Sequence, residues 1–384
     1  MAATVVKMKA ESAAAVGSAP AAPAVAGAAR GGRGAAALTG TRRRGERHYE
    51  RAFSVLTVAG LGFVVPLLRL ARGEDARTQL SALWRLALVP LIAIGVFLFL
   101  WSQSSSRIVT SLGRIPGPVA VWSQAGALWA DHKAERAKAA AFYQRQAVRN
   151  AERLAGDPNA ELQRVRYTGK PTYIDQILTS LRTVFTGFLV ASLVAIPLGI
   201  LCGLSATLSA ALNPFIQIFK PVSPMAWLPL VTMVVSALYV SDDPLFEKSY
   251  INSSITVALC SMWPTLINTA LGVSSIDKDL LNVSKVLKLG WGTKLFRIVL
   301  PSSLPLIFTG LRLSLGVGWM VLIAAEMLAQ NPGLGKFVWD EFQNGSSESL
   351  SRLLVAVFTI GFIGFLLDRV MFTIQSLVSF KANR

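Results

Sequence analysis

Charged residues are scarce in this chain of 384 residues. Asp, Glu, Lys and Arg make up 15% of it, against roughly 25% in a typical soluble domain, while hydrophobic residues make up 53%. The hydrophobic residues form long blocks, several of about 18 residues or more, each able to cross the hydrocarbon layer of a membrane. The composition argues against a soluble globular protein and predicts a polytopic membrane protein.

Residues that form disulfides or bind metals are also few. The two cysteines, Cys202 and Cys260, lie inside apolar blocks, and the two histidines, His48 and His132, lie far apart in polar segments. This argues against a disulfide framework and a zinc site. We predict no catalytic, cofactor-binding or metal-binding residues. A membrane-embedded enzyme is disfavoured because it would need such groups clustered at membrane depth.

Acidic residues are outnumbered, 21 Asp and Glu against 38 Lys and Arg. In a membrane protein, this excess favours basic residues at the cytosolic ends of spans and near anionic headgroups. Residues 1–51 are rich in Ala and Gly, have no acid between Glu11 and Glu46, and end in an arginine cluster. We expect them to form a disordered, basic cytosolic tail.

The apolar blocks predict an all-α fold with six membrane-spanning helices. They are 86–101, 183–204, 225–240, 254–273, 305–329 and 353–378. Segment 52–68 is marginal in length and contains glycine and proline, so 52–85 is expected to be juxtamembrane or interfacial, with seven spans as the alternative. In the fifth span, Gly310, Ser314 and Gly318 form a small-residue stripe that predicts close helix packing within one bundle.

The polar segment between the first two spans, 102–175, is expected to be an extracytoplasmic loop. Its centre, 131–156, is rich in strong helix formers and ends in a stop signal at Gly156. The net-acidic loop 241–253 is predicted outside and the basic loop 274–304 in the cytosol. Six spans then place both termini in the cytosol.

The loop 274–304 has the pattern of two short helices. Leu280, Val283 and Leu287 recur at helical spacing, with Asp277 or Asp279 as the N-cap and an end near Gly290. A second short helix is predicted over 292–300, ending at Pro301. A helix pair on the cytosolic face predicts a docking surface, with a simple interfacial pair as the alternative.

This loop resembles the cytosolic loop of ABC importer permeases, which follows the pattern E-A-A-x3-G-x9-I-x-L-P. Residues 298–301, Ile-Val-Leu-Pro, match the last part of the pattern. The Glu-Ala-Ala positions fall on Asn282, Val283 and Ser284 and the glycine position on Lys288, so this part departs from the pattern, although Gly290 lies two residues later.

The flanking segments strengthen the resemblance. Segments 180–205, 219–235, 281–290, 300–329 and 333–345 look like the nitrate, bicarbonate and cyanate branch of these permeases, which is related to the taurine and alkanesulfonate branch. The likeness covers roughly 172–380 and is greatest to nitrate permeases. It implies that 176–380 is a permease domain with the type I ABC importer transmembrane fold, in the bacterial inner membrane.

The family also implies partners. These are a second permease copy, expected to form a homodimer, two cytosolic ABC ATPase subunits, and an extracytoplasmic solute-binding protein that delivers the anion through 241–253 and 331–352. The loop helix would sit in a groove of the ATPase. The implied ATPase-coupling residues are Leu281, Asn282, Val283, Ser284, Leu287, Lys288, Gly290, Ile298, Leu300 and Pro301. Since 331–337, NPGLGKF, lacks the spacing of a phosphate-binding loop, ATP hydrolysis is assigned to the partner.

Charges within spans are costly and suggest function by default. Arg182, Arg312 and Glu326 are therefore candidates for the translocation path. The arginines would favour an anion, or would only extend toward headgroups from span ends. Glu326 would repel an anion, so we expect a structural or gating role. Asp368 and Arg369 are expected to pair or to reach toward the cytosol.

The function predicted from the sequence is ATP-driven import of a small inorganic anion, nitrate or nitrite. Bicarbonate, cyanate and taurine or another sulfonate remain alternative substrates. A more distant alternative is an ion-coupled secondary transporter, which would show inverted repeats and broken helices near the middle of the membrane; the sequence has no matching halves.

Overall fold

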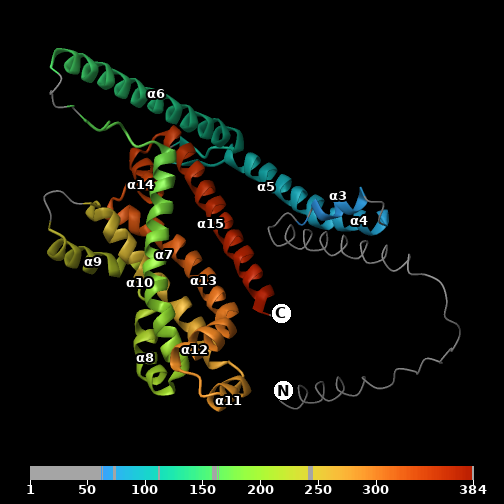
Figure 1. Ribbon diagram of the computed structural model, residues 1–384. Coiled ribbons are helices and arrows are strands. Elements are labelled where there is room, and N and C mark those ends of the chain that lie inside the picture. Colours follow the sequence, from blue (N-terminus) through green and yellow to red (C-terminus); the bar gives the residue numbers. More distant parts are fainter. Residues whose placement is uncertain are drawn as a thin grey trace, which may run out of the picture. The chain divides into compact units, whose positions relative to one another are not determined.

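The computed structural model of the chain describes residues 62, 64–71, 75–110, 113–157, 162, 164–240 and 245–382, all within one compact unit, Phe53–Arg384. The predicted tail 1–51 and residues 52–61 lie outside the described residues. The described part is helical (Figure 1) apart from one antiparallel pair, β1 (Val109–Thr110) and β2 (Gly113–Arg114). The all-α class is thus confirmed.

Five helices of the described part are long and apolar enough to cross a membrane. They cover Ala76–Ser105, Tyr173–Leu204, Lys248–Ser274, Trp291–Ala329 and Glu348–Val378. A bent helix pair brings the number to six if it is taken as one span. This agrees with the predicted six spans, five of them as single helices.

The first span is a composite helix. After the short α3 (Val64–Leu70), α4 (Ala76–Leu83), the π-turn η1 (Trp84–Leu88) and α5 (Val89–Ser105) run on without a break. Most apolar side chains of α5 are exposed to the surroundings, as expected of a helix that is apolar on every face and surrounded by lipid. Trp101 packs on Phe358, with ring centroids 5.2 Å apart.

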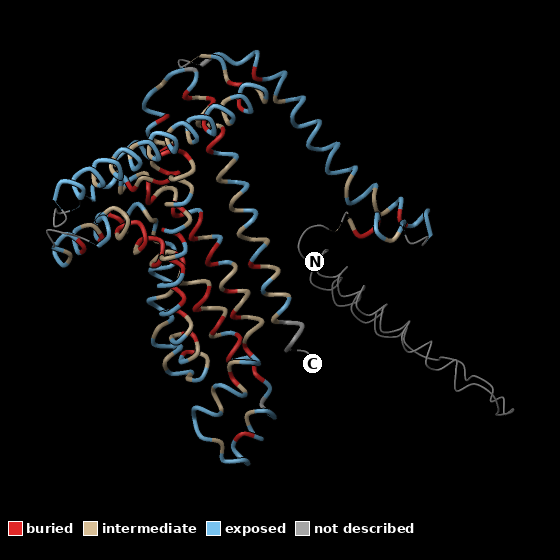
Figure 2. Tube along the Cα trace, turned by 45° about the horizontal axis from the view of Figure 1, so that its top comes forward, coloured by how far each residue is buried: buried red, intermediate tan, exposed pale blue. Residues whose placement is uncertain are grey.

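The helix predicted over 131–156 is confirmed, and it is longer than predicted. In the structure, α6 covers Pro118–Gly156 and begins with a proline in its first turn, where the missing N–H costs nothing. Val121 and Leu128 are buried in the main core, whereas most of the helix is exposed (Figure 2). The helix thus lies on the bundle by its first part and extends into solvent with the rest.

Three helices form the centre of the bundle: α7 (Tyr173–Leu204), α10 (Lys248–Ser274) and α13 (Leu300–Ala329). A Cβ at Gly187 of α7 would lie 2.7 Å from the Ser254 carbonyl oxygen of α10, and one at Gly310 of α13 would lie 2.9 Å from the Cα of Thr265. Close approach therefore requires glycine at both contacts. The stripe formed by Gly310, Ser314 and Gly318 packs against α10 within the chain.

These contacts also fix the directions of the spans. Gly187 and Gly199 of α7 meet Ser254 and Thr269 of α10 in the same order, so the two helices are parallel. Gly310 and Gly318 of α13 meet α10 in reverse order, at Thr265 and Ser261. The loop 274–304 therefore lies at one end of the bundle, and the starts of α7 and α10 lie at the other.

The predicted span 225–240 is one half of a bent pair. Here α8 (Ala206–Phe219) and α9 (Pro224–Leu238) meet at an angle of 103°. Pro221 stands in the break, where a proline disfavours helix in the residue before it. Pro224 is the first residue of α9, a position that suits proline. The helix α8 was not predicted, because its apolar residues are interrupted by Asn213, Pro214 and Gln217.

The prediction of a separate short helix over 292–300 is wrong, because these residues are the start of a longer helix. The chain forms α12 (Trp291–Lys294) and the π-turn η2 (Leu295–Val299) and then continues straight into α13. Pro301 does not stop the helix. A π-turn ends two residues before Pro301, as η1 does before Pro90, and the wider turn relieves the clash between a proline ring and the carbonyl four residues earlier.

Two helices complete the fold at the end opposite to the loop 274–304. The short α14 (Leu334–Asn344) follows α13, and α15 (Ser347–Ala382) returns along it. The Trp319 indole N–H of α13 donates a hydrogen bond of 3.0 Å to the Ile360 carbonyl of α15. Figure 1 shows α6 and α14 at one end of the bundle and α11 (Lys278–Val286) with α12 at the other.

Candidate functional site

The helix predicted in the loop 274–304 is confirmed as α11. Its N-cap is Asp277, whose carboxylate accepts a hydrogen bond of 2.9 Å from the Asp279 backbone N–H. Asp279 in the first turn and Lys285 in the last turn both suit the helix dipole. A short but well-capped helix therefore projects from the bundle at this end.

Apolar side chains of α11 and the start of α12 are exposed. Val283 is 52% exposed and Leu287 63%. Four further large apolar side chains of the same loop are also exposed, Leu280, Val286, Trp291 and Phe296. Such a concentration on a polar loop marks an interaction surface. We call these six residues the loop surface.

Not all the predicted coupling residues belong to the loop surface. Leu281 packs against a small core formed by Val273, Ile276 and Val299. Ser284 is buried, and its hydroxyl donates a hydrogen bond of 2.6 Å to the Leu281 carbonyl. These residues hold α11 to the bundle rather than face a partner. Sequence periodicity indicated the apolar positions but could not say which would turn inward.

The remaining predicted positions lie around α11. Asn282, Lys288, Gly290 and Pro301 are exposed, and Ile298 and Leu300 are half-buried at the junction of η2 and α13. Gly290 is the N-cap of α12, with no atom within 4 Å of the place a Cβ would take. These positions therefore contribute little exposed apolar surface. They lie in the loop and at its junction with α13.

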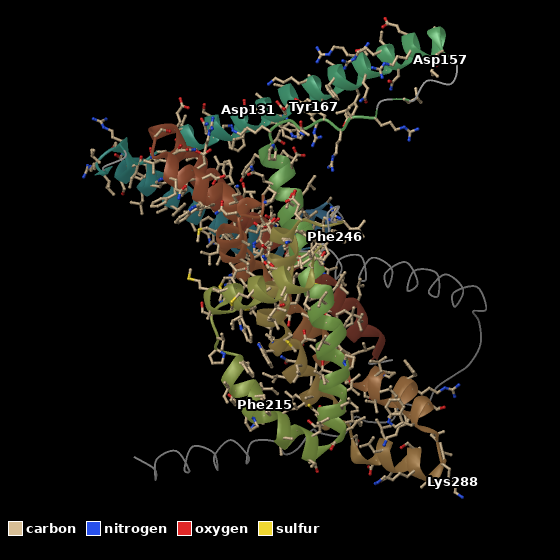
Figure 3. All side chains as sticks on the ribbon, turned by 90° about the vertical axis from the view of Figure 1, so that its left-hand side faces the viewer. Asp131, Asp157, Tyr167, Phe215, Phe246 and Lys288 are labelled. Atoms are coloured by element: carbon tan, nitrogen blue, oxygen red, sulfur yellow. The ribbon has the colours of Figure 1, made fainter. Side chains whose placement is uncertain are left out.

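The glycine position of the permease pattern has a specific conformation. Lys288 has φ of 50°, in the left-handed region. The Lys288 N–H donates to the Lys285 carbonyl and the Leu289 N–H to the Ser284 carbonyl, each at 3.0 Å, which is the Schellman arrangement of a helix end. Glycine adopts this conformation without strain, so the departure from the pattern falls where the backbone requires φ above zero (Figure 3).

Glu326 is fully buried and lies at the other end of the bundle, where it ties three helices together. The Ser180 hydroxyl of α7 lies within 2.9 Å of both its carboxylate oxygens, and the Gly335 N–H of α14 donates to Oε2 at 3.0 Å. The Leu334 N–H donates to the Ser180 hydroxyl at 2.8 Å. The carboxylate thus satisfies the first turn of α14, which supports the structural role expected for it.

Arg312 is engaged within the bundle. Its Nε and Nη2 donate to the two carboxylate oxygens of Asp368 on α15 at 2.6 and 2.9 Å, and the guanidinium lies over the Phe372 ring. The expected pairing of Asp368 with Arg369 is wrong, because adjacent residues of a helix do not face each other. Arg369 instead lies over Phe365 and Phe372. A bidentate pair leaves Arg312 poorly suited to hold a passing anion.

Arg182 has different surroundings. It is exposed on α7, and its guanidinium lies 5.7 Å from the ring centroid of Phe246 and 5.5 Å from that of Tyr250. In the described part of the chain, no carboxylate pairs with it. Arg312 pairs with Asp368, and Glu326 accepts hydrogen bonds from Ser180 and Gly335. Of the three predicted path residues, only Arg182 has a charged group without such a partner among the described residues.

A polar cavity of about 530 Å³ separates α6 from α14 at the same end of the bundle. Asp131, Glu135 and Lys138 of α6 line one wall, and Glu341 and Arg352 line the other. The side-chain ion pair of Arg352 and Glu341 measures 3.5 Å. Sequence analysis did not find this cavity, because no motif joins residues 200 positions apart.

Comparison with known proteins completes the description. Residues 195–382 match the family described as the binding-protein-dependent transport system inner membrane component. The solved methionine ABC transporter MetNI, in an inward-facing form, aligns with 54% of this chain and 95% of its own at 13% identity, with a TM-score of 0.46.

Relatives of this chain are named as nitrate and bicarbonate permeases. The nitrate import permease protein NrtB of Synechococcus elongatus is 36% identical over 204 residues, 53% of this chain and 69% of the relative. The bicarbonate transport system permease protein CmpB of Synechocystis is 38% identical over 205 residues, 53% of this chain and 68% of the relative. Because the chain covers more than two thirds of each relative, it belongs to the family of binding-protein-dependent inner-membrane components, the permease subunits of ABC importers.

Proposed function

We propose that this protein is the membrane-spanning subunit of an ATP-driven importer of a small inorganic anion, with nitrate or nitrite as the first candidate substrate. Similarity to the nitrate permease NrtB supports this substrate. Bicarbonate is the second candidate, supported by the comparable identity to CmpB. Both are small planar oxyanions, so one transmembrane domain can serve either with little change. Cyanate and sulfonates such as taurine are the further alternatives.

The loop surface is the observation that carries the proposal. Its six exposed apolar side chains lie on α11, just after it, and at the start of the helix that continues into α13: Leu280, Val283, Val286, Leu287, Trp291 and Phe296. Burial of such side chains is favourable by about 25 cal/mol for each Å² removed from water. A groove in an ATPase subunit would supply that burial, and the continuous helix from Trp291 to Ala329 would transmit ATPase closure into the bundle.

The assembly we propose contains two copies of this chain, two cytosolic ATPase subunits and an extracytoplasmic solute-binding protein. The basic loop 274–304 faces the cytosol by charge. The long segment containing α6, the start of α10 and α14 then faces outside, and the C-terminus is cytosolic. The binding protein would dock at the outer end, near α14 and α6.

Leu287→Asp tests the proposal. A central apolar anchor lost from an interface costs about 2 kcal/mol or more, which lowers affinity roughly thirtyfold. We expect the ATPase to stop co-purifying with the permease and anion uptake to fall, while the mutant permease remains in the membrane, because position 287 lies outside the bundle.

Lys285→Gln is the matched control. It lowers the net charge by the same single unit on the opposite face of α11, and Lys285 makes its recorded helix-end bond through the backbone carbonyl. ATPase should co-purify normally with this variant. Retained ATPase and full uptake in Leu287→Asp would contradict the assignment of this loop to ATPase coupling.

A further inference from the structure

Arg182 lies in the third turn of α7, near the end of the bundle that carries α14. Its guanidinium lies over the rings of Phe246 and Tyr250, and it forms no ion pair with a carboxylate of the described residues. A guanidinium over two rings is oriented by cation–π attraction yet keeps its N–H donors free for another acceptor. Figure 3 labels Phe246 beside α7.

A groove of about 340 Å³ opens beside this guanidinium between α7 and α10. Arg182, Thr186 and Val190 line it from α7, and Phe246, Tyr250 and Ser254 line it from α10 and the segment before it. No acidic residue is among the described residues that line it, and among these Arg182 alone carries a formal charge. A groove with one positive charge attracts anions and repels cations.

Hydroxyl groups complete the polar wall of the groove. The Tyr250 hydroxyl and the Thr186 hydroxyl lie 2.5 Å apart. The Thr186 hydroxyl also donates to the Arg182 backbone carbonyl at 2.9 Å, so the Tyr250 hydroxyl is the donor between the two and reaches a ligand only by giving up its bond to Thr186. The Ser254 hydroxyl is buried and has no hydrogen-bond partner among the described residues. Buried hydroxyls without a partner are uncommon and call for a ligand or water.

We propose that Arg182, Thr186 and Tyr250 form a binding site for a small planar oxyanion, a station on the import route. This rests on the proposed function, because the occupant is the imported anion. The guanidinium fork matches two oxygens of such an ion, and the Tyr250 hydroxyl serves the third by exchanging its bond to Thr186 for one to the ion. The aromatic rings limit water around the ion, which strengthens each charged hydrogen bond. The phosphate of a lipid headgroup could bind by the same contacts. The experiment must therefore distinguish the imported anion from a lipid.

The direct test follows the reactivity of Arg182. The whole transporter, purified in a phosphate-free maltoside detergent, is treated with the arginine reagent phenylglyoxal, and the modified fraction at Arg182 is measured by peptide mass spectrometry. Sodium nitrate, sodium bicarbonate or sodium gluconate is added at equal ionic strength. At an anion concentration about ten times its Kd, only the free fraction reacts, so modification should slow roughly tenfold.

Each arm has a defined meaning. Protection by nitrate or bicarbonate but not gluconate supports the site, and the anion that protects at lower concentration names the preferred substrate. Protection only after phospholipid is added would identify a lipid headgroup as the occupant and overturn the import role. No protection by any anion would overturn the site. Arg312, paired with Asp368, is the internal control and should react alike in all arms.

Transport by variants is the second measurement. Arg182→Gln should raise the KM for uptake roughly tenfold, about 1.4 kcal/mol, with ATPase co-purification unchanged. Arg182→Lys, which keeps the charge without the fork, should fall between wild type and Arg182→Gln. Tyr250→Phe should raise the KM by a smaller factor.

The failures of the two proposals are distinguishable. If wild type imports nitrate or bicarbonate while Arg182→Gln shows an unchanged KM, the site is wrong and the proposed function stands. If wild type imports neither anion, the proposed function is wrong. Full rescue by Arg182→Lys of a defect confined to membrane insertion would reduce Arg182 to a headgroup anchor.

Discussion

At the scale of single residues, the charges within the spans divide by what surrounds them. Glu326 is fully buried against Ser180 and the first turn of α14, and Arg312 is paired with Asp368. Both satisfy other groups of the chain. Sequence analysis identified these residues as costly in a membrane, but it could not name their partners, which lie 146 and 56 positions away.

Glu326→Gln should loosen α14. The amide keeps the shape but replaces the carboxylate oxygen Oε2, which both the Ser180 hydroxyl and the Gly335 N–H reach, with a neutral acceptor. A hydrogen bond to a charged group contributes about 1.5–3 kcal/mol, whereas one between neutral groups contributes about 0.5–1.5 kcal/mol. Hydrogen exchange at the Gly335 amide should therefore rise by one to two orders of magnitude in the purified protein.

Ser180→Ala is the companion variant, because it removes the bridge to α7 and leaves the carboxyl group of Glu326 in place. It should expose the Leu334 amide, which donates to the Ser180 hydroxyl. Unchanged exchange at Leu334 and Gly335 in both variants would show that these bonds do not hold α14, and transport defects would then need another cause.

Lys288→Gly should stabilise the end of α11. Lys288 adopts φ of 50°, which costs an ordinary residue about 1 kcal/mol that glycine avoids. Slower hydrogen exchange at the Leu289 amide, which bonds the Ser284 carbonyl, is the expected readout. Lys285→Gly, inside the helix, should have the opposite effect by about 0.5–1 kcal/mol. Faster exchange in Lys288→Gly would contradict the assigned helix end.

At the scale of elements, long apolar runs were predictable and their interruptions were not. The helices α7, α10, α13 and α15 contain the predicted spans, because about 20 apolar residues in lipid must satisfy their own backbone. Of the bent pair, α9 was predicted and α8 was not, because the angle at the break after Phe219 depends on packing that the sequence does not show. Pro301 was predicted to end a helix, because the sequence carries no pattern that predicts the π-turn before it.

The segment after α6 shows how a polar element is fastened. The Tyr167 hydroxyl donates to Glu135 of α6 at 2.7 Å, and the Tyr167 N–H donates to the Tyr143 hydroxyl at 3.2 Å (Figure 3). A Cβ at Gly169 would lie 2.2 Å from the Tyr167 ring. The segment therefore lies closely on α6, held by a titratable pair at the solvent surface.

That pair predicts a pH window for the segment. The hydrogen bond from Tyr167, then that from Lys138, lowers the pKa of Glu135 below 4.5, and Glu135 in turn raises the pKa of Tyr167 above 10.0. The lowered carboxyl pKa gives stability that is present above pH 4.5 and lost as pH falls through the folded value. The raised phenol pKa gives stability present below pH 10 and lost as pH rises through the folded value.

Hydrogen exchange of residues 164–170, corrected for the intrinsic rate, should therefore be slowest between these limits. Glu135→Gln should remove the acid dependence, because the amide does not titrate. Lys138→Gln should only weaken it, since Lys138 is the second contributor. An acid loss of protection that persists in Glu135→Gln would assign it to another group.

At the scale of the whole molecule, the two ends of the bundle differ, and the proposed function assigns one to a cytosolic partner and the other to an outer one. The loop surface and α11 lie at one end, and α6, α14, Arg182 and the polar cavity lie toward the other. Loop charges predicted these opposite ends correctly, because the parallel and antiparallel contacts of α7, α10 and α13 agree with the alternation of sides. How α6 lies on the bundle was beyond prediction, since most of its apolar residues are alanines, which mark no single face of the helix.

Cysteine labelling tests which end faces the cytosol. In a variant with Cys202→Ala and Cys260→Ala, single cysteines are placed at Leu245, which is 91% exposed before α10, at Arg145 on α6, and at Lys285 on α11. An impermeant thiol reagent added outside intact cells should modify Leu245→Cys and Arg145→Cys. It should reach Lys285→Cys only after permeabilisation, because the basic loop is retained in the cytosol.

Ser18→Cys extends this test to the number of spans. Six spans place residue 18 in the cytosol together with Lys285, whereas a seventh span over 52–68 would place it outside, since each added crossing reverses the side of everything before it. Labelling of Ser18→Cys from outside, with Lys285→Cys still protected, would establish seven spans. Labelling of Lys285→Cys with protection of Leu245→Cys would invert the whole orientation, and the loop surface could then no longer meet a cytosolic ATPase.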